Sequence, residues 1–194
     1  MGIEFELKFR GNKEALEAMD RDIPGDRQVY AMATTYYDTP TGALSDLRYT
    51  LRCRRENDRF VCTLKTPAAG MGRNEFELDC PDIQTALPQL CQMSGLETLP
   101  GLLEEGVTPV CYARFTRIAK TVVLPGCTVE VALDQGILGG GDRQEPLCEA
   151  EVELKAGTEA AAKAYAAQLA VAYGLTPEPK SKFRRAQLLA TGEK

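Results

Sequence analysis

Residues 3–10 alternate apolar and charged side chains at every position. They read Ile-Glu-Phe-Glu-Leu-Lys-Phe-Arg, a period of two that places the charged groups on one face of an extended strand: Glu4, Glu6, Lys8 and Arg10. Carboxylates of this kind bind divalent cations, and ammonium or guanidinium groups bind phosphates. The segment therefore offers both kinds of ligand on a single surface.

The same alternation recurs in later segments of the chain. In-phase cations are Arg52, Arg54, Lys65 and Arg73, and in-phase carboxylates are Glu75, Glu77, Glu130, Asp134, Glu149, Glu151 and Glu153. For a single strand, the ordinary explanation is a face that meets water. For the whole set this explanation weakens, because carboxylates about 7 Å apart along a strand repel one another. Divalent cations would offset that repulsion, and the cations suit a polyanion.

The composition limits which other chemistry is available. The chain has no histidine, and its seven cysteines form no Cys-x-x-Cys pair, which excludes a thiolate–imidazole zinc site and nucleophiles paired with histidine. We expect the cysteines to be reduced and mostly buried. In an enzyme of this composition, proton transfer would be carried out by carboxylates, lysine, tyrosine or metal-bound water.

Length and charge point to one globular domain over residues 1–194. Hydrophobic residues make up 44% and charged residues 26% of the chain, values that argue against wholesale disorder. The net charge of −5 argues against a nucleic-acid partner. No apolar run is long enough to span a membrane and the N-terminus lacks a signal-peptide core, so we expect a cytoplasmic protein without a membrane partner.

The elements that would position these charges are mostly short strands. Strand-like segments are residues 3–10, 28–37, 48–55, 59–65, 73–79, 110–124, 128–134 and 147–155. Helices are predicted at residues 13–20, 81–93, 158–173 and 181–190, with Asp82 near the start of the second and Thr158 and Gly174 as caps of the third. The sequence Gly139-Gly140-Gly141-Asp142 is predicted to be a loop, and without a following Gly-Lys-Ser/Thr it does not indicate a P-loop.

This order of segments predicts an α+β fold that is mainly β. Successive strands joined by turns favour an antiparallel sheet that closes or nearly closes, with a few flanking helices. If the charged faces turn inward they line a polar tunnel, and the helices are available to cover the apolar outside.

Taken in order, these segments resemble the CYTH superfamily, the triphosphate tunnel metalloenzymes. Glu4-x-Glu6-x-Lys8 resembles the opening signature of that family. The further matching segments are Tyr36–Pro40, Leu51-Arg52-Cys53-Arg54, Thr63-Leu64-Lys65, Arg73-x-Glu75-x-Glu77, Val129–Gly136, Cys148–Leu154 and Ser181-Lys182. The bacterial inorganic triphosphatases are similar in particular.

The resemblance implies a closed, eight-stranded antiparallel β-barrel tunnel that hydrolyses inorganic tripolyphosphate to pyrophosphate and phosphate with Mg²⁺ or Mn²⁺. Implied metal-binding positions are Glu4, Glu6, Glu149, Glu151, Glu153 and Asp134, with Glu130 as a helper. Implied phosphate-binding positions are Lys8, Arg52, Arg54, Lys65, Arg73, Arg117 and Lys182. Among all of these, the implied catalytic residues are Glu4, Glu6, Lys8, Arg52, Arg54 and Lys65.

Several alternatives stay open at this point. Arg114 and Arg117 differ by three positions and so face opposite sides of a regular strand. Arg117 is preferred because its spacing to the next strand better resembles that of the family. Arg185 either joins Lys182 or is a solvated helix residue. The substrate could instead be thiamine triphosphate or a nucleoside triphosphate, or ATP in an adenylate cyclase reaction. The protein could also be a non-catalytic module that binds polyphosphate, and it could form a homodimer. The sequence does not identify the carboxylate that activates water.

Overall fold

The computed structural model describes residues 5–68 and 73–192. Its strands are β1 (Glu6–Arg10), β2 (Gln28–Asp38), β3 (Thr50–Glu56), β4 (Arg59–Pro67), β5 (Arg73–Asp79), β6 (Thr108–Leu124), β7 (Cys127–Gly140), β8 (Arg143–Gly157) and β9 (Thr176–Pro177). Its helices are α1 (Lys13–Asp22), α2 (Ala43–Asp46), α3 (Ile83–Ser94), α4 (Leu99–Leu102), α5 (Glu159–Tyr173) and α6 (Lys182–Thr191).

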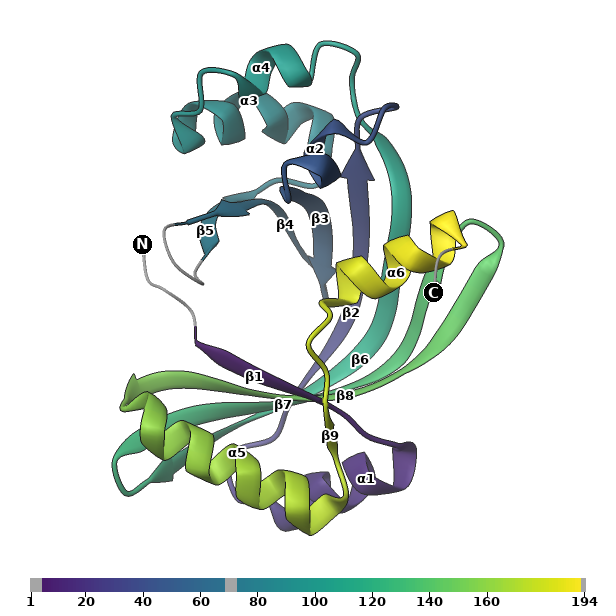
Figure 1. Ribbon diagram of the computed structural model, residues 1–194. Helices are drawn as coiled ribbons and strands as arrows, with labels where there is room; N and C mark the ends of the chain where they lie inside the picture. The colour runs from purple at the N-terminus through teal and green to yellow at the C-terminus, as the bar shows by residue number, and fades with distance from the viewer. Residues whose placement is uncertain (1–4, 69–72, 193–194) are drawn as a thin grey trace.

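The strands in this part of the chain form one antiparallel sheet of nine strands in the order β5-β4-β3-β2-β6-β7-β8-β1-β9. The sheet is strongly curved (Figure 1). Helices α1 and α5 cover the outside of one half, α2, α3 and α4 lie over the other half, and α6 lies inside the curve. The prediction of a mainly β, antiparallel fold with flanking helices is confirmed. The described ladder runs from β5 to β9, and β9 adds a short strand to the eight expected.

Beneath α1 and α5, the outer side of the sheet is apolar. Phe9, Val131 and Val152 come from three neighbouring strands and pack with Leu16 of α1 and Leu169 of α5. All five residues are at most 8% exposed, so the outer side of the sheet is shielded from water where α1 and α5 cover it. Their burial follows directly from the period of two, because charged residues alternate with them along each strand.

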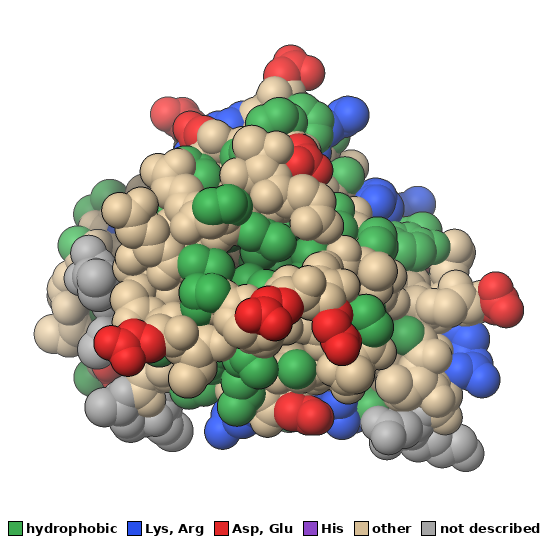
Figure 2. All heavy atoms as spheres, turned by 90° about the horizontal axis from the view of Figure 1, so that it is seen from above, with side chains coloured by type: hydrophobic (Ala, Val, Ile, Leu, Met, Phe, Trp, Pro, Cys, Tyr) green, Lys and Arg blue, Asp and Glu red, His purple; other side chains and the backbone are tan. Residues whose placement is uncertain are grey.

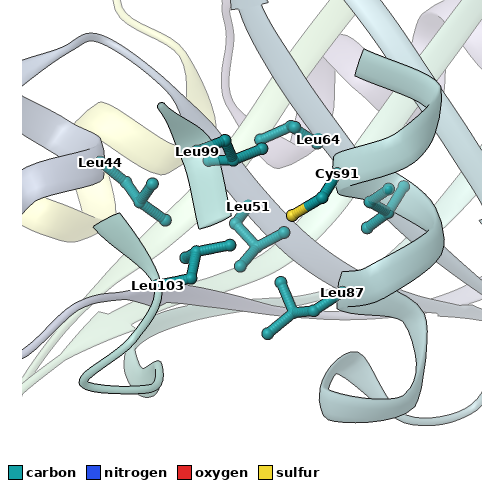
Figure 3. A pocket seen from close by; sticks show the side chains of 8 residues that line it. Leu44, Leu51, Leu64, Leu87, Cys91, Leu99 and Leu103 are labelled. Atoms are coloured by element: carbon teal, nitrogen blue, oxygen red, sulfur yellow. The ribbon is translucent and has the colours of Figure 1, made fainter. Parts of the chain in front are cut away.

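A second apolar core lies beneath α2, α3 and α4. Figure 3 shows leucines from these helices pointing toward Leu51 of β3 and Leu64 of β4, together with Cys91. The space between these side chains is too narrow to hold a water molecule. Two helix layers therefore bury much of the outer face of the sheet, and the charged faces turn toward the inside of the curve.

Helix α6 packs on the concave side of the sheet. Ala186 of α6 is fully buried among Met32, Phe115, Leu138 and further apolar residues of β2, β6, β7 and β8. A side chain at Gly140 would come within 2.3 Å of the Ala186 carbonyl oxygen, so only glycine allows this close approach. The concave face is therefore apolar where α6 covers it and charged elsewhere.

The predicted caps Thr158 and Gly174 are confirmed, and Asp82 and Ser181 are further N-caps that the sequence analysis did not assign. The side chains of Asp82, Thr158 and Ser181 each accept a backbone N–H from the first turn of α3, α5 and α6. Gly174 ends α5 in the left-handed conformation, with φ of 63°. These caps satisfy backbone groups that would otherwise lack partners.

The predicted loop at Gly139–Asp142 is wrong. Gly139 and Gly140 continue β7, and only Gly141 and Asp142 form the turn. The predicted strands at residues 128–134 and 147–155 are accordingly too short. Pairing of β7 with the long strand β6 continues as far as Cys111 and Gly140, and these cross-strand contacts outweigh the low strand preference of glycine. Strand β3 begins at Thr50 rather than residue 48, because Arg48 has a positive φ of 59° in the preceding turn.

Figure 2 shows the outer surface on the side of α3 and α4. Apolar side chains cross the middle of this face, acidic groups lie in front of them, and lysine and arginine are seen only toward its margin. Among the described residues, this face therefore shows no central cluster of cations for an anionic ligand, in contrast with the inside of the curved sheet.

Candidate functional site

Cross-strand register brings the predicted charged residues onto one face of the sheet. Glu6, Lys8 and Arg10 of β1 lie opposite Glu153, Glu151 and Glu149 of β8, respectively. The same register continues through Glu130 and Asp134 of β7 to Arg117 of β6. On the other half of the sheet it joins Arg52 and Arg54 of β3, Lys65 of β4, and Glu75 and Glu77 of β5. The period-two pattern thus predicted a shared face correctly.

Arg117 and Arg114 lie on opposite faces of β6, as the sequence predicted. Arg117 lies on the charged face, opposite Asp134, while Arg114 lies opposite Ile137 on the other face. Arg114 is exposed and donates to the carbonyl oxygen of Thr34 at 2.5 Å. Only Arg117 of this pair is therefore placed to contribute to the site.

Three buried carboxylates lie together near the centre of the charged face. Asp134, Glu149 and Glu151 each offer an oxygen within 4.8 Å of the others. The side chains of Asp134 and Glu149 are completely buried, and that of Glu151 is 11% exposed. A group of this kind fits a hard cation, because such ions bind several carboxylate oxygens. We call these three residues the carboxylate cage.

Cations of the protein already contact this cage. Arg117 donates two hydrogen bonds of 2.7 Å to Asp134 and one of 2.5 Å to Glu151. The ammonium of Lys182 pairs with all three carboxylates, at 2.8 Å from Asp134 and 2.7 Å from Glu151. Arg185 donates to Glu149 at 3.0 Å, so it joins Lys182 at the site and is not a solvated helix residue.

The pKa values in the cage follow from burial and these contacts. Burial raises the pKa of Glu149 to about 7. Burial acts in the same direction on Glu151, yet Lys182 and Arg117 outweigh it and hold the pKa of that carboxyl well below its ordinary value. Burial would lower the pKa of Lys182, but Glu151, Asp134 and Glu149 raise it above its usual range. Near neutral pH the cage is therefore a network of mixed charge.

A second set of carboxylates forms a cross-strand row. Glu6, Glu153 and Glu130 lie directly opposite one another on β1, β8 and β7. Lys8 approaches Glu6 at 3.5 Å, and Lys155 approaches Glu153 at 2.6 Å. Like charges in such a row destabilise a sheet, so the row also fits a divalent cation. Glu4, two residues before Glu6, lies outside the described residues.

Arg52 and Arg54 form a basic wall across the curve from the cage. Burial lowers the pKa of Arg52, whose guanidinium pairs with Glu75 at 3.3 Å. Lys65 pairs with Glu75 at 2.9 Å, and Arg54 with Glu56 at 3.0 Å. The Nε atoms of Arg52 and Arg54 are buried and have no hydrogen-bond partner within the described part of the chain.

Arg73 is placed at the outer end of this wall. It starts β5 and donates to the carbonyl oxygen of Arg48. Burial lowers its pKa, and the nearby Arg48 acts in the same direction. A basic pair of this kind favours an anionic neighbour.

Sequence reasoning missed two carboxylates that support the site. Glu145 accepts from Arg185 at 2.8 Å, and Glu178 accepts from Arg10 at 3.0 Å. Glu145 lies on the same face as Glu149, and the alternation would have included it had the strand been started earlier. The contact of Glu178 depends on β9 returning beside β1, which no local pattern indicates.

Comparison with known proteins agrees with the fold and the motifs. Residues 2–186 match the family model of the CYTH domain. The chain belongs to the CYTH family. Its sequence is 32% identical over 136 residues to an inorganic triphosphatase of Haemophilus influenzae, covering 68% of this chain and 38% of that protein. The chain therefore spans well under half the length of this relative.

Solved structures show the same CYTH architecture. A Hippeastrum protein described as an adenylyl cyclase with a dominant triphosphatase activity superposes with a TM-score of 0.67 at 16% identity, covering 99% and 97% of the two chains. The PH1819 protein of Pyrococcus horikoshii gives a TM-score of 0.62 at 21% identity, covering 98% and 99%. At such identities the similarity concerns the fold.

None of the helices in residues 5–68 and 73–192 combines the length and the apolar character that a membrane span requires.

Proposed function

We propose that this CYTH protein hydrolyses inorganic tripolyphosphate to pyrophosphate and phosphate in the presence of Mg²⁺ or Mn²⁺. The observation that carries the proposal is the unsatisfied pair of guanidinium Nε atoms on Arg52 and Arg54. A buried donor without a partner costs about 1–3 kcal/mol, more when charged, and such groups are rare in folded proteins. A phosphate oxygen at the basic wall would accept from both.

The substrate class follows from the charge on the two halves of the sheet. Arg52, Arg54 and Lys65 would bind the phosphates of a linear triphosphate from the β3–β4 half, with Arg73 at the outer end. Lys8 would bind it from the β1 half, where it lies opposite Glu151. Guanidinium groups suit phosphate because they donate two parallel hydrogen bonds. These cations alternate with carboxylates, so a compact polyanion is favoured over a long nucleic acid.

Carboxylates of β1 and β8, with Glu4 before them, would hold the divalent cation. Glu6 and Glu153 are directly opposite each other, and Glu151 is the next residue on that face of β8. Glu4 precedes Glu6 in the same alternation of the sequence. When bound, the metal polarises the transferred phosphoryl group and neutralises developing charge. The protein residues orient the chain of phosphates and balance its charge, which is most of what phosphoryl transfer requires.

A substrate panel tests the proposal. Purified protein is incubated with Mg²⁺ and tripolyphosphate, ATP or thiamine triphosphate, and the products are separated by ion chromatography. Tripolyphosphate should give the highest kcat/KM, with equal amounts of pyrophosphate and phosphate. Cyclic AMP from ATP would indicate a cyclase, and tight binding without turnover would indicate a binding module; either result contradicts the proposal.

Arg52→Met and Arg55→Met form a matched pair for this assay. Arg55 is an exposed residue of the same strand on the opposite face. Loss of a charge-assisted hydrogen bond is worth about 1.5–3 kcal/mol, so Arg52→Met should lower kcat/KM about 10- to 150-fold. Arg55→Met should leave it unchanged. Equal values for the two variants would remove the basic wall from the mechanism.

A further inference from the structure

The ammonium of Lys182 lies where the carboxylate cage would hold a metal ion. It contacts one oxygen from each of Asp134, Glu149 and Glu151, which is as many partners as an ammonium has hydrogens. Its side chain is only 10% exposed. The cage is thus filled by a cation that belongs to the protein.

Helix α6 holds Lys182 in this position. Lys182 is the first residue of the helix, and Ser181 caps the same end by accepting from the backbone N–H of Arg184. One turn further on, Arg185 is anchored to Glu145 and Glu149. The far side of the helix is tied to α2, where Gln187 donates to the Ser45 hydroxyl at 2.7 Å.

The ammonium and a divalent cation cannot share the cage. Both require the same carboxylate oxygens, and two positive charges a few ångströms apart repel strongly in a buried site. The cage is also balanced without a metal, because Lys182, Arg117 and Arg185 offset its carboxylates. Binding of a divalent cation there therefore requires the ammonium to leave.

We propose that Lys182 is an internal cation that closes the cage of the free protein and moves to a substrate phosphate when a divalent cation enters. The inference rests on the proposed function, since it takes the ligands to be a divalent cation and an inorganic triphosphate. Its consequence is coupled binding. The triphosphate offers the displaced ammonium a new partner, so each ligand strengthens the binding of the other, as linkage requires.

Calorimetric titration with Mn²⁺ alone tests this inference without any turnover. The variants are Lys182→Met and, as the control, Lys163→Met, whose lysine is exposed on α5, pairs with Glu159 and lies over the Phe5 ring, away from the cage. Lys182→Met should bind Mn²⁺ about 5- to 150-fold more tightly than the parent, the usual range of coupling between sites. Lys163→Met should match the parent. Equal affinity in all three proteins overturns the inference.

The second arm adds an imido-bridged tripolyphosphate, which resists hydrolysis. In the parent protein this analogue should tighten Mn²⁺ binding, and in Lys182→Met it should tighten it much less. Undiminished coupling in Lys182→Met overturns the inference, because the ammonium would then have no part in it.

A second variant, which changes no charged residue, tests the inference if Lys182→Met does not fold. Gln187→Ala removes the hydrogen bond from α6 to Ser45 and leaves every charge in place. It should loosen α6 and so tighten Mn²⁺ binding, by less than Lys182→Met does. Unchanged affinity in this variant contradicts a movable lysine.

Hydrolysis of tripolyphosphate by the parent protein is measured separately. Turnover with unchanged Mn²⁺ affinity in the variants would refute the lysine exchange and leave the proposed function standing. Coupled binding of Mn²⁺ and the triphosphate analogue without any turnover would support the lysine exchange and refute the proposed hydrolase activity.

Discussion

Replacing Arg117 by methionine should destabilise the protein far more than the same change three residues earlier. Arg117 is 18% exposed and supplies three hydrogen bonds to the cage, two of them to the fully buried Asp134. Removing one partner of a buried ion pair costs about 3–5 kcal/mol, since a charge is left uncompensated. Lys182 still contacts Asp134 and Glu151, which places the expected loss near the lower limit, ~3 kcal/mol.

Arg114→Met is the matched control for this experiment. Arg114 is exposed, lies on the opposite face and donates mainly to backbone carbonyl oxygens. It also stacks on the Tyr112 ring at 5.0 Å, an interaction worth about 0.5–1 kcal/mol at an exposed position. We therefore expect a loss of ~1 kcal/mol or less.

Urea unfolding followed by circular dichroism measures both losses directly. For a chain of this length about 1 kcal/mol corresponds to roughly 2–4 °C, so Arg117→Met should lower Tm by about 6–12 °C. Arg117→Lys should fall between the two, because it keeps the charge and loses the bidentate geometry. Equal destabilisation by Arg117→Met and Arg114→Met would refute the assignment of Arg117 to a buried ionic network.

Three further outcomes are expected. EDTA should abolish tripolyphosphate hydrolysis and Mg²⁺ should restore it; full activity in EDTA would contradict the metal requirement. The pKa of Glu149, about 7 when folded, exceeds its ordinary value of 4.5, so between these pH values the folded protein retains a proton that the unfolded chain has lost. The contribution of Glu149 to the free energy of unfolding therefore declines as the pH rises through this window. Urea unfolding at several pH values should show a smaller decline in the Glu149→Gln variant. Lys120→Met should cost about 1–3 kcal/mol in urea unfolding, because the buried Lys120 donates to the carbonyl oxygens of Asp20 and Ile23 at the end of α1. A loss no larger than that of Lys163→Met would contradict this role.

Much of this arrangement is predictable from local patterns. The alternation in β1, β3 and β8 fixes which residues share a face, because successive side chains on a strand point to opposite sides. The caps of α3, α5 and α6 are equally local, since they depend on one side chain and the next turn. The same reasoning separated Arg114 from Arg117 correctly.

Contacts between distant elements were not predictable in this way. The alternation places Asp134, Glu149 and Glu151 on one face, yet it does not show that Lys182 fills the space between them. That contact depends on α6 packing inside the curve, which requires Gly140 and the apolar surface beneath the helix. The extension of β7 through Gly139 was missed for the same reason. Pairing with β6, rather than the strand preference of glycine, decides where β7 ends.

The two carboxylate groups differ in how far the protein itself neutralises them. The cage of Asp134, Glu149 and Glu151 is buried and contacted by three cations of β6 and α6. The row of Glu6, Glu153 and Glu130 is more exposed and is approached by Lys8 and Lys155. A buried carboxylate needs a positively charged or hydrogen-bonding partner, whereas a more exposed carboxylate remains hydrated by water. In the proposed exchange, Lys182 meets the first requirement in the free protein and gives up its place to a divalent cation. This difference explains why one CYTH sheet combines a firmly paired centre with a more open acidic edge.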